Sequence, residues 1–125
     1  MASSTPQTIF LTGATGYIGG RLAPRLLDEG HTIRCLSRSA SKLTARTWAS
    51  QDRVEIIEGD ASDEQLLADA MQGCHAAYYL VHSMDTTNSS YRQRDLEVAQ
   101  TFARACKLAG VERIIYLGGL GELGD

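Results

Sequence analysis

The chain has 125 residues, a formal net charge of −3 at pH 7 and 43% hydrophobic residues, which fits one globular domain. The slightly negative charge, without a basic cluster, argues against nucleic acid or an anionic membrane surface as a partner. No apolar run approaches the roughly 20 residues that span a bilayer, which argues against a membrane protein.

Residues 1–7, MASSTPQ, are expected to form a disordered leader, and residues 8–125 one domain. The leader has neither the basic region nor the apolar core of a secretory signal. Cys35, Cys74 and Cys106 are odd in number and too scattered for a metal or redox motif. We therefore expect buried thiols, no metal site and a cytoplasmic location.

A strand over residues 8–13, a glycine turn and a helix over residues 16–29 are predicted first. Gly13, Gly16 and Gly19 have the spacing GxxGxxG. Gly13 would allow a sharp turn, Gly16 a close approach to a pyrophosphate, and Gly19 tight packing of helix on strand. Free N–H groups at the helix N-terminus would bind the phosphates. A plain tight turn is the alternative, and the strand–helix–strand context favours a dinucleotide site.

An apolar stripe at helical period supports the helix over residues 16–29. The stripe consists of Ile18, Leu22, Ala23, Leu26 and Leu27. Pro24 removes one backbone hydrogen bond within the helix, and Gly30 is expected to cap its C-terminus.

The second strand, residues 32–37, is followed by Arg38 rather than by the acid that accepts the ribose hydroxyls in NAD sites. A guanidinium suits a 2′-phosphate because it is planar and permanently charged. Arg38, with Ser37, Ser39 and Lys42 nearby, therefore favours NADP, with NAD as the other cofactor. A solvated surface arginine is the alternative.

Residues 39–53 are polar, and a short helix is predicted within them around residues 42–48. Trp48 is expected to be a local hydrophobic anchor. The third strand follows at residues 54–57.

Asp60 follows the end of the third strand, at the edge where ligands of open α/β sheets bind. It would meet the adenine amino group, or it would form a turn; both interpretations are open. A helix over residues 63–72 comes next, capped by Ser62 or Asp63.

The fourth strand, residues 76–81, is almost continuously apolar, which is typical of a strand covered on both faces. Leu80, Val81 and His82 at its end would line the cofactor crevice. His82 would either transfer a proton near neutral pH or form a hydrogen-bonded wall of the site.

A long helix over residues 90–109 and a fifth strand over residues 113–117 follow. The helix is expected to bury Leu96, Ala99, Phe102, Ala103 and Cys106. The alternation of strands and helices predicts a three-layer, doubly wound, parallel α/β sheet of five strands in the order 3-2-1-4-5. The fifth strand would lie at an open edge, which favours a homo-oligomer through that edge.

Five segments in this order resemble the atypical and extended short-chain dehydrogenase/reductase superfamily, and within it the NmrA-like, NAD(P)H-binding proteins. The segments are TGATGYIGG (12–20), LSRSASKL (36–43), EGDASD (58–63), AAYYLVHSM (76–84) and AGVERIIYLGGLG (109–121). The resemblance covers nearly all of the chain from residue 8. It implies the N-terminal, Rossmann-type portion of an NAD(P)-dependent oxidoreductase.

The resemblance also implies cofactor-binding positions. The pyrophosphate loop corresponds to Gly13, Thr15, Gly16, Tyr17, Ile18 and Gly19. The NADP-selecting position corresponds to Arg38, with Ser39 beside it, and the adenine-flanking pair to Asp60 and Ala61. The strand end beside the ribose and nicotinamide corresponds to Leu80, Val81 and His82.

The sequence departs from the superfamily at the catalytic centre, which is usually a Ser or Thr after the fifth strand and a Tyr-xxx-Lys pair. Gly118 and Gly119 follow the strand here, and no Tyr-xxx-Lys occurs. Asp95 stands where many extended members have Asn. Because the substrate region should begin where the chain ends, we expect part of a longer protein or a shortened relative. The chain would be the cofactor half of an oxidoreductase, or a non-catalytic regulatory or redox-sensing module.

Overall fold

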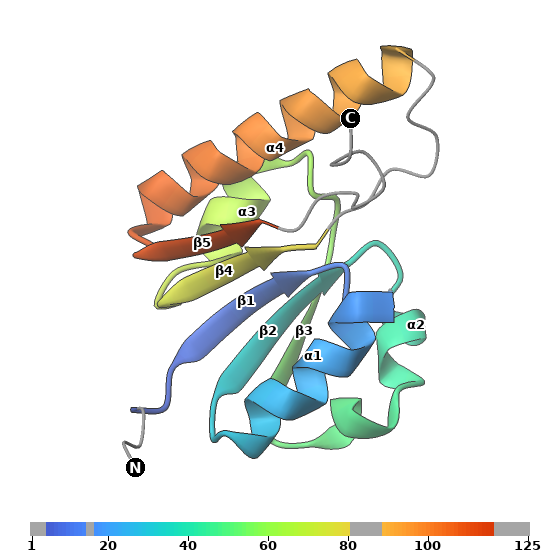
Figure 1. The fold of residues 1–125 in the computed structure, drawn as a ribbon, viewed down its shortest axis with the longest axis vertical. Helices are drawn as coiled ribbons and strands as arrows, with labels where there is room; N and C mark the ends of the chain where they lie inside the picture. Colours follow the sequence, from blue (N-terminus) through green and yellow to red (C-terminus); the bar gives the residue numbers. More distant parts are fainter. Residues whose placement is uncertain (1–4, 15–16, 81–88, 117–125) are drawn as a thin grey trace, which may run out of the picture.

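The computed structural model describes residues 5–14, 17–80 and 89–116, and these residues form an alternating series of strands and helices (Figure 1). The elements are β1 (Thr8–Thr12), α1 (Tyr17–Asp28), β2 (Thr32–Ser37), α2 (Ala40–Thr44), the 3-10 helix η1 (Thr47–Ser50), β3 (Val54–Glu58), α3 (Glu64–Ala70), β4 (Ala76–Tyr79), α4 (Ser89–Ala109) and β5 (Arg113–Tyr116). The single helix expected around residues 42–48 is instead two short helices, α2 and η1.

The strands form one parallel sheet in the order β3-β2-β1-β4-β5, which confirms the predicted topology. Thr12, the last residue of β1, pairs with Leu36 of β2 on one side and with Tyr79 of β4 on the other. The carboxyl ends of the three central strands therefore meet at one edge of the sheet. This carboxyl edge is where an open α/β sheet binds its ligands.

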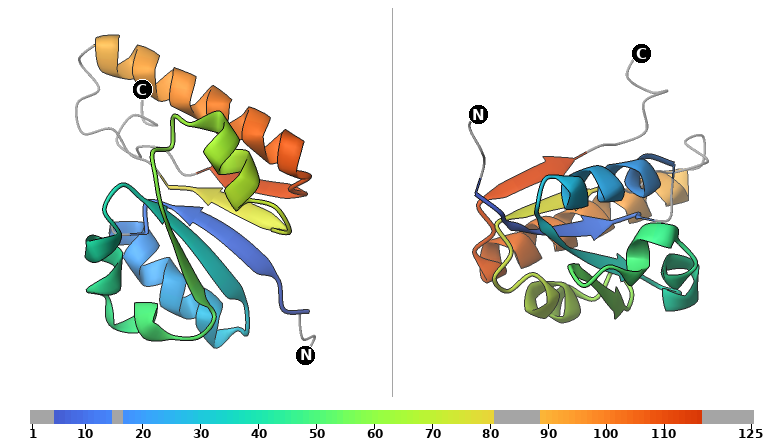
Figure 2. Two further views of the ribbon diagram at one scale, coloured as in Figure 1. Left: turned by 180° about the vertical axis from the view of Figure 1, so that it is seen from behind. Right: turned by 90° about the horizontal axis from the view of Figure 1, so that it is seen from below.

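Helices cover both faces of the sheet, so its central strands are buried on two sides (Figure 2). One cluster packs Ala23, Leu26 and Leu27 of α1 against Ile9 and Leu11 of β1, and includes Trp48 of η1. Trp48 is therefore the hydrophobic anchor expected from the sequence. The opposite cluster packs α3 and α4 against the other face; its members include Phe10, Leu67, Met71, Ala77, Tyr79 and Phe102.

Three residues that were expected on the buried faces of α1 and α4 are exposed instead. Ile18 is 40% exposed because it lies in the first turn of α1, past the end of β1, where no strand covers it. Ala103 is exposed because Phe102, Ala105 and Cys106 form the buried face of α4, and Ala103 lies beside that face.

Leu96 is 52% exposed because α4 is longer than the sheet beneath it. A helix of 21 residues spans about 31 Å, whereas the four-residue strands β4 and β5 span about 13 Å each. The first half of α4 therefore extends past the strands, as Figure 1 shows, and only its second half packs on the sheet.

Candidate functional site

The glycine turn lies at the carboxyl end of β1, between β1 and α1. Gly13 has a φ of +78°, a conformation that side chains rarely adopt. A Cβ atom on Gly13 would lie 2.5 Å from the carbonyl oxygen of Leu80, which follows β4. A Cβ on Gly19 would overlap the carbonyl oxygen of Gly13, so α1 touches the turn at this point. The turn and the close packing expected of Gly13 and Gly19 both have a steric basis here.

Thr12 is a residue of this site that the sequence does not single out. Its side chain is buried, and its Oγ1 accepts a hydrogen bond from the backbone N–H of Leu80 at 3.3 Å and donates to the carbonyl of Tyr78 at 3.4 Å. The hydroxyl thus fixes the end of β4 against the glycine turn. The only sequence signal was a polar residue closing a buried apolar strand.

Residues 37–39 form a compact turn at the carboxyl end of β2. The Ser37 hydroxyl donates to the carbonyl of Ser39 at 3.0 Å and accepts from the N–H of Ser39 at 3.1 Å. Arg38 between them is exposed, and among the described residues no hydrogen bond holds its guanidinium. The turn therefore presents a cationic side chain at the same edge as Gly13.

Asp60 lies beyond the end of β3, close enough to Arg38 for the two charges to interact. Its Oδ1 accepts from the N–H of Ser62 at 2.9 Å. Hydrogen bonds from the backbone and hydroxyl of Ser62 hold the pKa of the Asp60 carboxyl below its ordinary value, and Arg38 adds to this. Of the two interpretations left open for Asp60, the turn-forming contact is thus present.

Some of the remaining positions expected to bind the cofactor lie within the described residues, and the others do not. Ala61 is half-buried against the α3–α4 core cluster, Leu80 is buried, and Ile18 is exposed on the first turn of α1. Thr15, Gly16, Val81 and His82 lie outside the described residues, as does the side chain of Tyr17.

Arg46, which follows α2, is a second cation at this edge that the sequence reasoning missed. Its Nη1 lies 3.8 Å from the position of a Cβ on Gly20, in the first turn of α1. Its place next to the glycine turn depends on how the chain folds back after α2, which no local pattern indicates. The carboxyl edge thus joins a bare glycine turn, a helix N-terminus and two arginines, a combination suited to phosphate groups.

Within the described ranges, no group of three His, Cys, Asp or Glu side chains is placed to hold a metal ion. In the same ranges, no helix has the length and apolar character needed to cross a membrane. Cys35, Cys74 and Cys106 are free and buried, as expected from the sequence.

Comparisons with known proteins point to the same kind of site. The family described as NAD(P)H-binding matches residues 13–124. The chain is 28% identical to a dihydroflavonol 4-reductase of Zea mays, with 97% of this chain and 37% of that protein covered. It is 29% identical to an NmrA-like family domain-containing oxidoreductase of Aspergillus japonicus, with 90% and 34% covered.

Among solved structures, the fold is similar to that of a short-chain dehydrogenase/reductase of Veillonella parvula in complex with NADP. The TM-score is 0.73 at 20% identity, over 96% of this chain and 51% of that one. At this identity the likeness shows the fold alone. The chain spans about a third of the length of the curated relatives that it matches, from 30% to 37%.

Proposed function

The chain belongs to the NAD(P)H-binding family of the atypical and extended short-chain dehydrogenase/reductases, and from that premise we propose that it is the cofactor-binding domain of an oxidoreductase that prefers NADP(H). The observation that carries the proposal is the carboxyl edge, where Gly13 and Arg38 directly follow the adjacent strands β1 and β2. We assign residues 8–125 to this domain.

The pyrophosphate is proposed to lie on the glycine turn and the N-terminus of α1. Gly13 and Gly19 support this place, because the lack of a side chain at both lets α1 begin directly against the turn at the end of β1, which brings the helix N-terminus to the carboxyl edge. The loop residues assigned to the same contact are Thr15, Gly16, Tyr17 and Ile18. A helix of 12 residues adds a partial positive charge at its N-terminus, which favours an anion there.

The 2′-phosphate is proposed to bind Arg38, with the hydroxyl of Ser39 beside it. The exposed guanidinium supports this choice, because among the described residues no hydrogen bond holds it and its charge is permanent. Asp60 and Ala61 are assigned to the adenine, and Leu80, Val81 and His82 to the ribose and nicotinamide side. When bound, the cofactor would supply the hydride, and the chain would orient it.

A fluorescence titration with NADPH and NADH tests the preference. Arg38→Asp should weaken NADPH binding by about 10- to 100-fold, which corresponds to the free energy that charge-assisted hydrogen bonds contribute. Binding of NADH should be little changed or stronger. Arg25→Asp, the same charge change in the last turn of α1, is the matched control and should leave both affinities unchanged. An unaltered ratio of the two affinities in Arg38→Asp would refute the assignment.

Gly16→Val tests the pyrophosphate position in the same titration. The added side chain should exclude the pyrophosphate, so binding of both cofactors should be lost. Unchanged binding of NADPH by this variant would contradict the placement.

A non-catalytic redox-sensing or regulatory module is the second candidate, favoured by the lack of a Tyr-xxx-Lys pair in these 125 residues. Incubation of the chain with NADPH and a panel of carbonyl acceptors separates the two. Oxidation of NADPH supports the oxidoreductase, and tight binding without turnover supports the module.

We also propose that the chain self-associates through β5 and has no nucleic-acid partner. Ile114 and Tyr116 of this edge strand are 44% and 60% exposed, which supports the first proposal, and the net charge of −3 supports the second. A single monomeric species in sedimentation velocity at high protein concentration would contradict self-association.

The three free thiols support a cytoplasmic location.

A further inference from the structure

The opposite edge of the sheet, where the strands begin, has an unusual arrangement at the start of β1. The backbone N–H of Gln7 donates to Nδ1 of His31 at 3.0 Å, and the backbone N–H of Thr8, the next residue, donates to Nδ1 of His75 at 3.2 Å. Two imidazoles thus accept from two consecutive main-chain amides. His31 precedes β2 and His75 precedes β4, the two strands that flank β1.

The imidazoles extend the hydrogen bonding of the sheet past its regular ladder. The carbonyl of Gln7 accepts from Thr32 at 2.9 Å, and that of Thr8 accepts from His75 at 2.8 Å. The regular pairing begins at Thr8 with Thr32 and at Ile9 with Ala76. Each ring therefore takes the place of a backbone carbonyl that the flanking strand no longer supplies. The first residues of β1 are held on both sides by side chains rather than by main chain.

An imidazole can accept through Nδ1 only while that nitrogen carries no proton. In the imidazolium form both ring nitrogens donate, so a proton on Nδ1 would face the N–H of Gln7 or Thr8. Histidine is the side chain that ordinarily changes charge between about pH 5 and 8. We infer that His31 and His75 form an acid-sensitive clamp that releases the start of β1 when both rings take up a proton.

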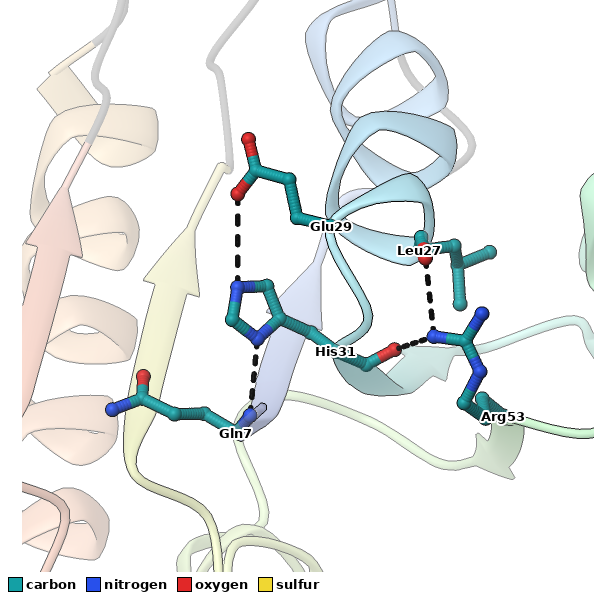
Figure 3. Close-up of polar contacts among 5 residues, drawn as sticks. All are labelled: Gln7, Leu27, Glu29, His31 and Arg53. Atoms are coloured by element: carbon teal, nitrogen blue, oxygen red, sulfur yellow. Dashed lines mark hydrogen bonds and ion pairs between the residues drawn. The ribbon is translucent and has the colours of Figure 1, made fainter. Parts of the chain in front are cut away.

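Two charged residues lie around His31. Nε2 of His31 lies 3.7 Å from a carboxylate oxygen of Glu29 (Figure 3). Arg53 donates through Nη1 to the carbonyls of His31, at 2.7 Å, and Leu27, at 3.1 Å (Figure 3). Because Arg53 binds the carbonyl and not the ring, it would hold the His31 backbone in place while the ring releases Gln7.

His75 differs from His31 in its surroundings. It is exposed, whereas His31 is 7% exposed. Its carbonyl accepts from the backbone N–H of Glu112, the residue before β5, at 3.2 Å. The strand β4 therefore stays paired on its other side when the bond from Thr8 is lost. Release is confined to the start of β1.

Amide hydrogen exchange followed by NMR tests the clamp on the full chain. After correction for the intrinsic rate, the protection of the Gln7 and Thr8 amides should fall by about fivefold or more between pH 7.5 and 5.5, as expected from the loss of one hydrogen bond each. The amide of Phe10, inside β1, should keep its protection. Unchanged protection at Gln7 and Thr8, or an equal loss at Phe10, would overturn the inference.

Two variants of each histidine distinguish the loss of the hydrogen-bond acceptor from a general disturbance of the fold. His31→Asn keeps an acceptor near the position of Nδ1 but does not titrate, so the Gln7 amide should stay protected at both pH values. His31→Phe removes the acceptor, so Gln7 should be unprotected at both. The same pair at His75 should act on Thr8 alone. A pH-dependent Gln7 amide in His31→Asn would contradict the clamp.

The ring nitrogens report directly on whether Nδ1 is the acceptor. Their ¹⁵N shifts at pH 7.5 should show both rings with the proton on Nε2 and an accepting Nδ1. A proton on Nδ1 in either ring at that pH is incompatible with the clamp. The inference does not depend on dinucleotide binding, which concerns the other edge of the sheet.

Discussion

Gly13 combines three roles at a single position. It leaves β1 with a positive φ, it lies directly against the carbonyl of Leu80, and its own carbonyl is covered by Gly19 of α1. A side chain at Gly13 would disturb the turn, the end of β4 and the start of α1 together. The site is therefore sensitive to a single added methyl group.

Gly13→Ala should lower the free energy of unfolding by about 2–4 kcal/mol, from backbone strain plus overpacking against Leu80. Gly73→Ala is the matched control: Gly73 has a φ of +83°, but a Cβ there meets nothing within 4 Å. It should cost about 1–2 kcal/mol, the strain alone. Urea denaturation of both variants measures the difference, and equal costs would show that the contact with Leu80 is unimportant.

The three thiols should be almost inert in the folded chain. Burial raises the pKa of Cys35 to about 12 and that of Cys106 to about 11, and it also raises the pKa of Cys74. At pH 8 the thiols therefore stay protonated, and alkylation of Cys35 by iodoacetamide should be roughly three orders of magnitude slower than in urea. Peptide mass spectrometry gives the rate for each residue. Native alkylation of Cys35 at the unfolded rate would mean that its strand opens readily.

At the scale of elements, Arg34 connects β2 with the end of α3. Its Nη1 donates to the carbonyls of Ala70 at 2.5 Å and Gln72 at 2.8 Å, and its Nε pairs with Glu55 of β3 at 2.6 Å. The two carbonyls belong to the C-terminal end of α3, where backbone acceptors lack partners within the helix. One side chain thus joins three elements.

Arg34→Ala should destabilise the fold by about 1–3 kcal/mol, because the two carbonyls lose their donor. Arg34→Lys should fall between the wild type and Ala, since one ammonium cannot reproduce the guanidinium geometry. Arg25→Ala, an exposed arginine of α1, should change stability by less than about 0.5 kcal/mol. Thermal denaturation of the three variants tests the order, and equal melting temperatures for Arg34→Ala and Arg25→Ala would exclude the role.

The sequence predicts elements well where a repeating pattern and a clear stop coincide, as in β2 and α1. It also predicts the bounds of α4, but not the exposure of Leu96, because the extent to which Leu96 is covered depends on the length of strands elsewhere. It also misses Thr12, whose partners Tyr78 and Leu80 lie 66 and 68 residues away. The same holds for Arg46 and for the two histidines that meet β1, since contacts between distant segments leave no local pattern.

At the scale of the whole molecule, the strand order follows from strands alternating with helices and from right-handed crossovers. That order brings the ends of β1, β2 and β4 together, so the positions of Gly13, Arg38 and Leu80 at one edge could be predicted. The two edges of the sheet then have different properties. The carboxyl edge presents glycine main chain and arginines, and the amino edge presents histidines that hold the start of β1.

The most direct test of the account is a ¹⁵N-NMR titration of the chain with NADP⁺. The account predicts saturable shifts for the amides at the carboxyl edge, namely Gly13, Gly19, Arg38, Asp60 and Leu80. Three glycines that precede strands at the amino edge, Gly30, Gly73 and Gly110, are internal controls and should not move. Shifts confined to the amino edge, or none at all at millimolar NADP⁺, would contradict the central claim that this chain binds a dinucleotide on its glycine turn.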